Sequence, residues 1–432
     1  MISSNSWLKS HRSFLLTIRY LRQRSKSQVP FHESPSTSSD HERSTRTNET
    51  VDDRTIEEST TKRKALQVAV IGTPNVGKSA ITNCLVKSEV CPVSRLIDTT
   101  RSNLLTSLTE EDFQLVVVDS PGLIRVEHAK KDIGVHPTAS IITDPDKAVE
   151  KAEHIVVVYD CTHPGRYIHH RVMHMLHRNS HIPSSLVINK VDLLKDRSQL
   201  LHLTPILTAG KVGGEAIALK PAHIGKLGVV NPKHLKGLRE MRIHTKDENI
   251  SPELQGLYRE LMDKPTHKCN WSDTKRLFLN TLGWPNFDSV FYVSALTGEG
   301  IDGLRDHLSK LANTVNMWRY EEDIITNKNM HDLCIEHVRA ALLDCLPGDI
   351  AYRLKVRIVE WMPPDDSNES LRIVTEVDCE KARWGKLVAR RVQPDEVGQR
   401  LQSLLNQPVM FQVHIKHKGK LVIVEDEEFE SD

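Results

Sequence analysis

The stretch "LQVAVIGTPNVGKS", residues 66–79, decides the fold of this 432-residue chain. Its first half is a continuous apolar run, which is typical of a parallel strand that is buried on both faces. Its second half, residues 72–79, has the form G-x-x-x-x-G-K-[ST], and the helical stretch "AITNCLVKS" follows at once. Strand, glycine-rich loop and helix in this order predict a domain that binds a nucleotide by its phosphates.

Each part of the loop suggests a contact with that nucleotide. Gly72 and Gly77 let the backbone turn so that its N–H groups face the phosphates at the positive end of the helix. Lys78 is expected to reach the β- and γ-phosphates, and the Ser79 hydroxyl is expected to ligate Mg²⁺. The predicted contacts in this loop are Gly72, Thr73, Pro74, Asn75, Val76, Gly77, Lys78, Ser79 and Ala80.

Further strands and helices alternate along the chain. The sequence predicts buried strands at residues 113–119, 154–160, 184–190 and 289–295. It predicts helices at residues 144–153, 168–179, 273–283 and 301–313. Such alternation indicates an α/β fold with a doubly wound, mostly parallel sheet, whose ligands bind at the carboxyl ends of the strands.

The tetrapeptide "NKVD", residues 189–192, selects the base. The Asp192 carboxylate can accept hydrogen bonds from guanine N1–H and the 2-amino group, and adenine lacks both donors. Asn189 is expected to contact guanine N7 and to steady the phosphate loop, while Lys190 packs against the base plane. The backbone N–H groups of "SAL", residues 294–296, are expected to face guanine O6, so GTP is favoured over ATP. The predicted base contacts are Asn189, Lys190, Val191, Asp192, Ser294, Ala295 and Leu296.

Taken together, "GTPNVGKS", "DTTR" (98–101), "DSPGL" (119–123), "NKVD" and "SAL" resemble the motifs of the Era family of GTPases. The "TTR" spacing and the stretch "GWPNF…VSAL" are similar to the mitochondrial members of that family in animals. The resemblance, which spans roughly residues 66–425, implies that Thr100 ligates Mg²⁺ and senses the γ-phosphate. It also implies that Asp119 holds Mg²⁺ through water and that the Gly122 N–H meets the γ-phosphate. The implied nucleotide contacts of this motif are Asp119, Ser120, Pro121, Gly122 and Leu123.

Hydrolysis is expected to be slow without help. Ras-like enzymes place a water-orienting Gln directly after the motif glycine, and here that position is Leu123, whose apolar side chain cannot align water. Lys78, Thr100 and Gly122 are the expected catalytic groups. The resemblance suggests that Asn75 helps to hold K⁺ as a substitute positive charge, and the residues themselves leave this open.

Two features of the domain permit more than one interpretation. Residues 196–272 lengthen one connection well beyond an ordinary crossover, and they predict either a flexible basic arm for RNA or an unconstrained solvated insertion. His170, His174 and His177 share one face of a predicted helix. That spacing could serve a transition metal, but a solvated surface is the favoured interpretation.

After about residue 320 the pattern changes. An amphipathic helix is predicted within 329–346, strands at 352–361 and 371–377, helices at 380–391 and 394–406, and a last strand at 409–417. This order is that of an α+β type II KH domain, as the Era resemblance implies. Positive charge on its helical part suits an RNA backbone, and the predicted RNA contacts are Lys381, Arg383, Lys386, Arg390 and Arg391.

One departure from the KH pattern keeps an alternative open. KH domains clamp RNA with a GXXG loop. No glycine lies between Gly385 and Gly398, and Arg390 and Arg391 stand about where the loop should be. A KH-like module that has lost RNA binding would instead make the chain a GTP-dependent switch or scaffold for protein partners.

The ends of the chain complete the predicted organisation. Residues 1–32 are basic, Ser-rich and free of acidic residues, which is typical of a mitochondrial transit peptide, with a disordered basic arm as the alternative. A disordered linker (33–63), a GTPase domain (64–318), a KH-like domain (319–425) and an acidic tail (426–432) are predicted to follow.

Composition and the family resemblance together indicate the expected location and partners of the protein. No apolar run is long enough for a membrane helix, and seven cysteines without a C-x-x-C pair fit a reducing compartment. The mitochondrial matrix is the expected location, with peripheral association with the inner membrane among the contacts considered. The resemblance implies small-subunit mitochondrial rRNA and the ribosomal subunit as partners, and assistance in subunit assembly as the function.

Overall fold

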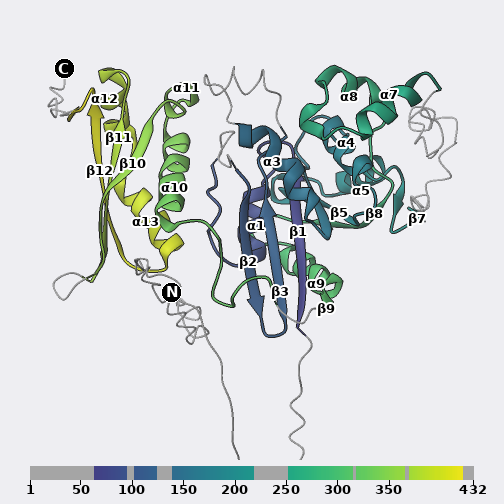
Figure 1. The fold of residues 1–432 in the computed structure, drawn as a ribbon, viewed down its shortest axis with the longest axis horizontal. Helices are drawn as coiled ribbons and strands as arrows, with labels where there is room; N and C mark the ends of the chain where they lie inside the picture. Colours follow the sequence, from purple (N-terminus) through teal and green to yellow (C-terminus); the bar gives the residue numbers. More distant parts are fainter. Residues whose placement is uncertain are drawn as a thin grey trace, which may run out of the picture. The chain divides into compact units, whose positions relative to one another are not determined.

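The computed structural model describes residues 63–94, 102–123, 139–217, 252–314, 318–364 and 369–421 (Figure 1). The predicted transit peptide, nearly all of the linker, Thr100, the acidic tail and residues 218–251 of the insertion lie outside these ranges.

The N-terminal module is built on one sheet with the strand order β2-β3-β1-β4-β5-β8. The neighbours pair in parallel, except that β2 runs antiparallel to β3, and the short β9 runs antiparallel to β1. The strands are β1 (Lys64–Gly72), β2 (Leu104–Glu110), β3 (Phe113–Asp119), β4 (His154–Asp160), β5 (Ser184–Asn189), β8 (Phe287–Tyr292) and β9 (Asn313–Thr314).

Side chains of β1 show why both faces of this sheet are covered. Leu66, Val68 and Val70 belong to one apolar cluster, while Ala69 and Ile71 belong to the other. This period of two places successive side chains on opposite faces, and each fully buried aliphatic side chain stabilises the fold by about 1.5–3 kcal/mol. The prediction of a doubly wound, mostly parallel α/β fold is therefore confirmed.

Helices cover the two faces. They are α1 (Lys78–Val86), α3 (Ala139–Glu150), α4 (His170–Arg178), α5 (Ser198–Leu207), α7 (Pro252–Met262), α8 (Trp271–Leu277) and α9 (Ile301–Leu311). The insertion also holds the strand pair β6 (Lys211–Val212) and β7 (Glu215–Ala216), and the one-turn helices η1 (Val191–Leu193) and η3 (Thr266–Lys268) occur in the same module.

Two helix predictions differ from the structure for identifiable reasons. The predicted helix 144–153 is α3, which begins at Ala139 and contains Pro145 in its interior. The predicted helix 273–283 is α8, which ends at Leu277. The chain after it packs closely on the end of α5, because a Cβ on Gly283 would lie 2.2 Å from the Ile206 carbonyl oxygen.

The C-terminal module has the order predicted for a type II KH domain. Its elements are α10 (Met330–Cys345), α11 (Gly348–Ala351), β10 (Lys355–Met362), β11 (Leu371–Asp378), α12 (Ala382–Arg391), α13 (Pro394–Leu405), β12 (Val409–His417) and β13 (Lys420–Leu421). The sheet order is β10-β11-β12-β13, with β11 and β12 parallel. The short α11 and β13 were not predicted. Leu333, Ile373 and Leu401 are among the side chains of its apolar core.

Candidate nucleotide-binding site

The phosphate loop and the base motif touch each other directly. Gly77 has a φ of +96°, and a Cβ on it would lie 2.2 Å from Asn189 Nδ2, so only glycine fits here. Asn189 Nδ2 donates to the Val76 carbonyl oxygen at 2.8 Å. The predicted role of Asn189 in steadying the phosphate loop agrees with this contact.

Lys78 lies folded along the loop, only 6% exposed. Its Nζ donates to the Thr73 carbonyl oxygen at 3.1 Å. Burial lowers the pKa of Lys78 to about 8, although the nearby Asp119 carboxylate acts in the opposite direction. A phosphate group placed beside the ammonium would favour its charged form further, since opposite charges stabilise each other at short range.

Ser79 and Asp119, two of the three residues predicted to hold Mg²⁺, contact each other. Ser79 Oγ donates to Asp119 Oδ2 at 2.6 Å, at the junction of α1 with the carboxyl end of β3. A hydroxyl and a carboxylate oxygen this close are the hard ligands that Mg²⁺ takes in proteins, so the donor set fits the ion. The third predicted ligand, Thr100, lies outside the described residues.

The "DSPGL" segment is held tightly against the phosphate loop. A Cβ on Gly122 would lie 2.8 Å from Pro74 Cα, and the Leu123 N–H donates to the Gly72 carbonyl oxygen at 3.2 Å. Ser120 Oγ donates to the Val70 carbonyl oxygen at 2.7 Å. The Leu123 side chain packs against the apolar cluster beneath it.

The "SAL" segment differs in one respect from expectation. The Ser294 N–H donates to the Glu299 carbonyl oxygen at 3.0 Å, and the Ala295 N–H donates to Asn189 Oδ1 at 3.0 Å. These two N–H groups therefore already have protein acceptors. A guanine O6 would have to displace Asn189 Oδ1 from Ala295, while Leu296, at the tip, is 85% exposed.

Lys190 is positioned by a residue that the sequence analysis missed. Its φ is +66°, and its Nζ lies 2.6 Å from Asp160 Oδ2. Burial raises the pKa of Asp160, but hydrogen bonds from Lys190 and Thr162 outweigh it, so the net shift is downward. The sequence contained a signal for Asp160. This carboxylate ends β4, which lies next to the strand that carries "NKVD", and the carboxyl ends of parallel strands meet at one edge of the sheet. Asp192 follows, half-buried, in η1.

The interpretation of His170, His174 and His177 as a solvated surface is wrong. His174 is fully buried, with Nδ1 2.9 Å from Thr266 Oγ1 and Nε2 2.9 Å from the Leu261 carbonyl oxygen. Burial lowers the pKa of His174 and so favours the neutral ring. At the end of the insertion, α7 and η3 contact α4, and at its beginning α5 buries Leu200, Leu203 and Leu207 in an apolar cluster. The unconstrained interpretation is therefore also wrong for the described parts of the insertion. Among the described residues, no group of three or more His, Cys, Asp or Glu side chains is arranged to hold a metal ion.

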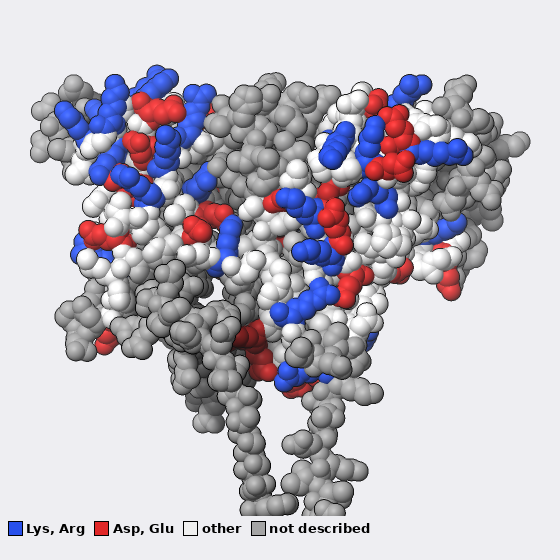
Figure 2. Space-filling view, viewed as in Figure 1, with Lys and Arg blue, Asp and Glu red and all other residues white. Residues whose placement is uncertain are grey.

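Of the predicted RNA-contacting residues, Lys381 directly precedes α12 and the other four lie on it. Lys381, Arg383, Lys386, Arg390 and Arg391 are all exposed. Figure 2 shows lysine and arginine side chains gathered at the end of the C-terminal module where Figure 1 places α12. Arg390 and Arg391 are the last two residues of that helix, and only residues 392–393 connect it to α13. In the part of the chain that the structure describes, no helix is long and apolar enough to cross a membrane.

The chain is similar to known proteins both in its nucleotide-binding region and over most of its length. The family described as "50S ribosome-binding GTPase" matches residues 67–190. "GTPase Era, mitochondrial" of Caenorhabditis elegans is 42% identical over 371 residues, covering 83% of this chain and 91% of that protein. The protein of the same name from Danio rerio is 29% identical over 82% of this chain and 75% of its own length.

A solved structure resembles the whole described fold. It is the crystal structure of Era in complex with MgGDPNP and nucleotides 1506–1542 of 16S ribosomal RNA. The two chains are 20% identical, with a TM-score of 0.54, and the match covers 82% of this chain and 94% of the other. At this identity the likeness supports the fold, a GTPase module followed by a KH-like module.

Proposed function

The chain belongs to the family of mitochondrial Era GTPases, and from this premise we propose that its GTP cycle serves the assembly of the small ribosomal subunit in mitochondria. In this proposal the KH-like module binds the small-subunit rRNA, and hydrolysis of GTP to GDP releases or resets the complex. The observation that carries it is a phosphate loop and a basic KH-like helix, α12, in one chain. The solved Era relative was crystallised with a segment of 16S ribosomal RNA, which is consistent with such a target.

At the nucleotide site, different residues would bind the phosphates, the base and the metal ion. Lys78 and the N-terminal end of α1 would hold the phosphates, and Asp192 would select guanine. Ser79, Thr100 and Asp119 would hold Mg²⁺, and the Gly122 N–H would meet the γ-phosphate. When bound, Mg²⁺ neutralises charge on the phosphate oxygens.

Slow intrinsic hydrolysis is part of the proposal. Leu123 packs against the apolar cluster, and an apolar side chain cannot align water. Exchange of this residue alone, Leu123→Gln, should leave the rate within about tenfold of wild type, because water placement also requires the surrounding backbone. A larger rate gain would show that this account of hydrolysis is wrong.

We also propose K⁺ as an auxiliary cation near Asn75, whose φ of +59° turns the loop at this point. If so, the rate of GTP hydrolysis should be higher in KCl than in NaCl, and Asn75→Ala should remove the difference. Equal rates in both salts would contradict this part of the proposal.

The proposed location is the mitochondrial matrix, where any contact with the inner membrane would be peripheral. Residues 1–63 fused to a fluorescent protein should direct it to the matrix, because the first 32 residues are basic and free of acids. A fusion that stays in the cytosol would remove the support that the sequence gives.

The central experiment measures the RNA partner. Crosslinking of the tagged full-length protein to RNA in cells, followed by sequencing, should recover small-subunit mitochondrial rRNA. The chain with Arg390→Ala and Arg391→Ala serves as the comparison, because both residues end α12. If wild-type protein crosslinks to no RNA and binds none at low salt, the alternative of a GTP-dependent switch for protein partners replaces this proposal. The two-residue connection between α12 and α13, without GXXG, is the feature that favours that alternative.

A further inference from the structure

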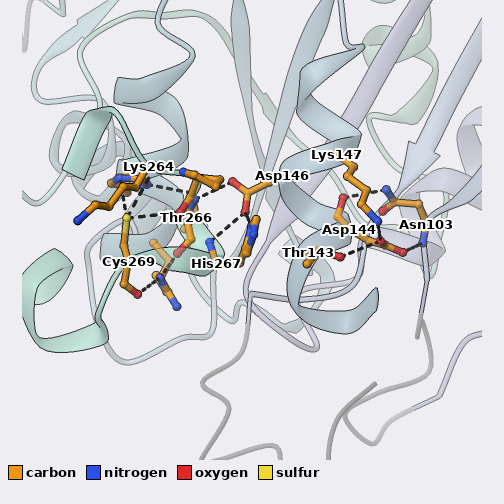
Figure 3. A network of polar contacts seen from close by, with 12 residues as sticks. Asn103, Thr143, Asp144, Asp146, Lys147, Lys264, Thr266, His267 and Cys269 are labelled. Carbon is orange, nitrogen blue, oxygen red and sulfur yellow. Dashed lines mark hydrogen bonds and ion pairs between the residues drawn. The ribbon is translucent and has the colours of Figure 1, made fainter. Parts of the chain in front are cut away.

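Helix α3 carries two buried carboxylates that face different neighbours. Asp144 is 7% exposed and Asp146 is 4% exposed. Two positions apart on a helix correspond to a rotation of about 200°, so the two side chains leave α3 on opposite sides. Buried carboxylates require hydrogen-bond or ionic partners, and each finds its own (Figure 3).

Asp144 ties α3 to the start of β2. Its Oδ2 accepts the Asn103 N–H at 3.1 Å, and Asn103 Nδ2 donates to the Asp144 carbonyl oxygen at 2.8 Å. Lys147 Nζ lies 3.1 Å from Asp144 Oδ1 and partly neutralises the carboxylate. Asn103 follows Thr100 by three positions in the chain. In the sequence, only Arg101 and Ser102 separate the residue expected to sense the γ-phosphate from the residue that is bound to α3.

Asp146 ties the other side of α3 to the end of the insertion. Its Oδ1 accepts the Thr266 N–H at 2.9 Å, and its Oδ2 accepts the His267 N–H at 3.0 Å. His267 Nδ1 lies 2.8 Å from the same oxygen, and it is the donor because an ionised carboxylate can only accept. Three donors from two successive residues converge on one carboxylate, which caps η3.

The end of the insertion is held from its far side as well. Arg171 Nη1 donates to the carbonyl oxygens of Thr266 and Cys269, the latter at 3.1 Å. His174 contacts the Thr266 hydroxyl at 2.9 Å. The short segment 265–269 is thus fixed between α3 and α4 by three buried side chains of the GTPase core. Asp146 is the one of these three side chains that lies on α3, and it binds backbone N–H groups, so a shift of α3 would strain or break these bonds.

We propose that Asp146 is a positioning residue that couples the end of the insertion to the nucleotide site through α3. The proposal rests on the proposed function, in which Thr100 and Gly122 meet the γ-phosphate. Asn103 and α3 follow the two segments that hold these residues, at 98–101 and 119–123. In this proposal, the contacts of Asp146 with segment 265–269 belong to the position of α3 that goes with bound GTP. Coupling of this kind is reciprocal, so the bound nucleotide also changes the stability of segment 265–269.

Hydrogen exchange of the full-length protein tests the proposal directly. Amide exchange is compared between the GDP complex and a complex with a non-hydrolysable GTP analogue. The peptide covering residues 264–269 should be protected more strongly with the analogue, because the Thr266 and His267 amides donate to Asp146. A peptide from α9 should show no difference. Equal exchange of 264–269 in the two complexes, with clear protection of residues 72–80, overturns this inference alone. No nucleotide-dependent protection of 72–80 overturns the proposed function and this inference together.

A variant supplies the second readout. Asp146→Asn keeps the size of the side chain but places an NH₂ group opposite backbone donors. The ratio of the dissociation constant for the analogue to that for GDP should rise by about fivefold or more, with little change for GDP alone. Glu336→Gln is the matched control, because Glu336 is a partly buried carboxylate of α10 paired with Lys328 at 2.5 Å. An unchanged ratio in a folded Asp146→Asn protein overturns the inference. If that variant does not fold, His267→Ala, which keeps the backbone bonds to Asp146, should still weaken the analogue-dependent protection of 264–269.

Discussion

In the proposed nucleotide site, Asp192 is the residue on which the choice of base should depend. It is half-buried in η1, next to the Asn189 that joins the phosphate loop to the "SAL" segment. Asp192→Asn replaces one acceptor oxygen with an NH₂ donor that faces the guanine 2-amino group. Affinity for GTP should fall by about 10- to 100-fold, while xanthosine triphosphate, which carries an oxygen at that position, should gain in relative affinity.

Titration calorimetry with both nucleotides checks the change of preference. Asp196→Asn is the control, because Asp196 is an exposed aspartate a few residues further on that caps the Ser198 N–H. Unchanged GTP affinity in the Asp192→Asn protein would remove this residue from the site.

In the proposed nucleotide site, Asp160 would act on the base through Lys190. The carboxylate holds the Lys190 ammonium at 2.6 Å, and both side chains are partly shielded from solvent. Asp160→Asn should leave the lysine less fixed and increase the dissociation rate of GDP by about three- to tenfold, a modest value because the pair is not fully buried. Stopped-flow release of a fluorescent GDP analogue measures this rate. A rate equal to that of wild type would mean that Lys190 finds its place without Asp160.

At the scale of the elements, α12 is the proposed RNA contact, and it should set how RNA binding depends on salt. Its last two residues, Arg390 and Arg391, are exposed, and no glycine loop follows them. Binding through side-chain charge releases counterions, at about 0.7 log units of salt dependence per phosphate contact on single strands. Arg390→Ala with Arg391→Ala should therefore reduce the log–log salt slope by roughly 1–1.5, measured with labelled small-subunit rRNA fragments at several KCl concentrations.

The control for this prediction carries the same charge change on another helix. Lys275 and Arg276 are exposed neighbours on α8 in the GTPase module. Replacing both with alanine should leave the slope unaltered if α12 is the RNA contact, and GTP affinity should be unaffected by either pair. Equal reductions from both double variants would indicate a diffuse effect of net charge.

The elements also show what the sequence could and could not reveal. β3 and β4 were predicted residue for residue, because a continuous apolar run has one explanation in a parallel sheet. β2 was missed, since "LLTSLTE" has too few apolar residues to stand out and is stabilised as an edge strand by its pairing with β3.

The sequence-based predictions were wrong where a side chain binds a partner that is distant in the sequence. "DPD", residues 144–146, has the signature of a helix start, with an aspartate cap before a proline. In the structure those carboxylates bind Asn103 and Thr266 instead, and the helix begins five residues earlier. The polar face of α4 suggested solvent for the same reason, because only the folded insertion shows what covers His174. Local patterns cannot reveal such partners.

For the molecule as a whole, buried histidines predict loss of stability in acid. His154 opens β4, is 1% exposed, and shares a hydrogen bond of 2.8 Å with Ser185 Oγ. Burial, followed by the nearby His307, lowers the pKa of His154 from 6.5 to about 4. Between these values the unfolded chain binds the proton and the folded chain does not. Stability is therefore retained above pH 6.5 and is lost as the pH falls toward 4.

This one histidine should lower the free energy of unfolding by about 2 kcal/mol between pH 7 and pH 5. Urea unfolding at both pH values measures the free energy of unfolding of the wild type and of His154→Phe. The loss of this free energy between pH 7 and pH 5 should be about 2 kcal/mol smaller in the variant. His202→Phe, at an exposed histidine of α5, should leave the pH dependence as it is in the wild type. An undiminished pH dependence in His154→Phe would show that other groups control acid unfolding.

The strand order of the larger sheet has a consequence for how the protein folds during its synthesis. β1 lies between β3 and β4, and its first residues, Lys64 and Ala65, pair with Thr314 and Asn313. Among the strands of this sheet, a ribosome delivers β1 first and β9 last, so the apolar β1 of the nascent chain waits for its neighbours. Pairings so distant in sequence form slowly and leave unpaired strand edges prone to aggregation. Chaperones that shield β1 during synthesis should therefore raise the yield of the folded protein.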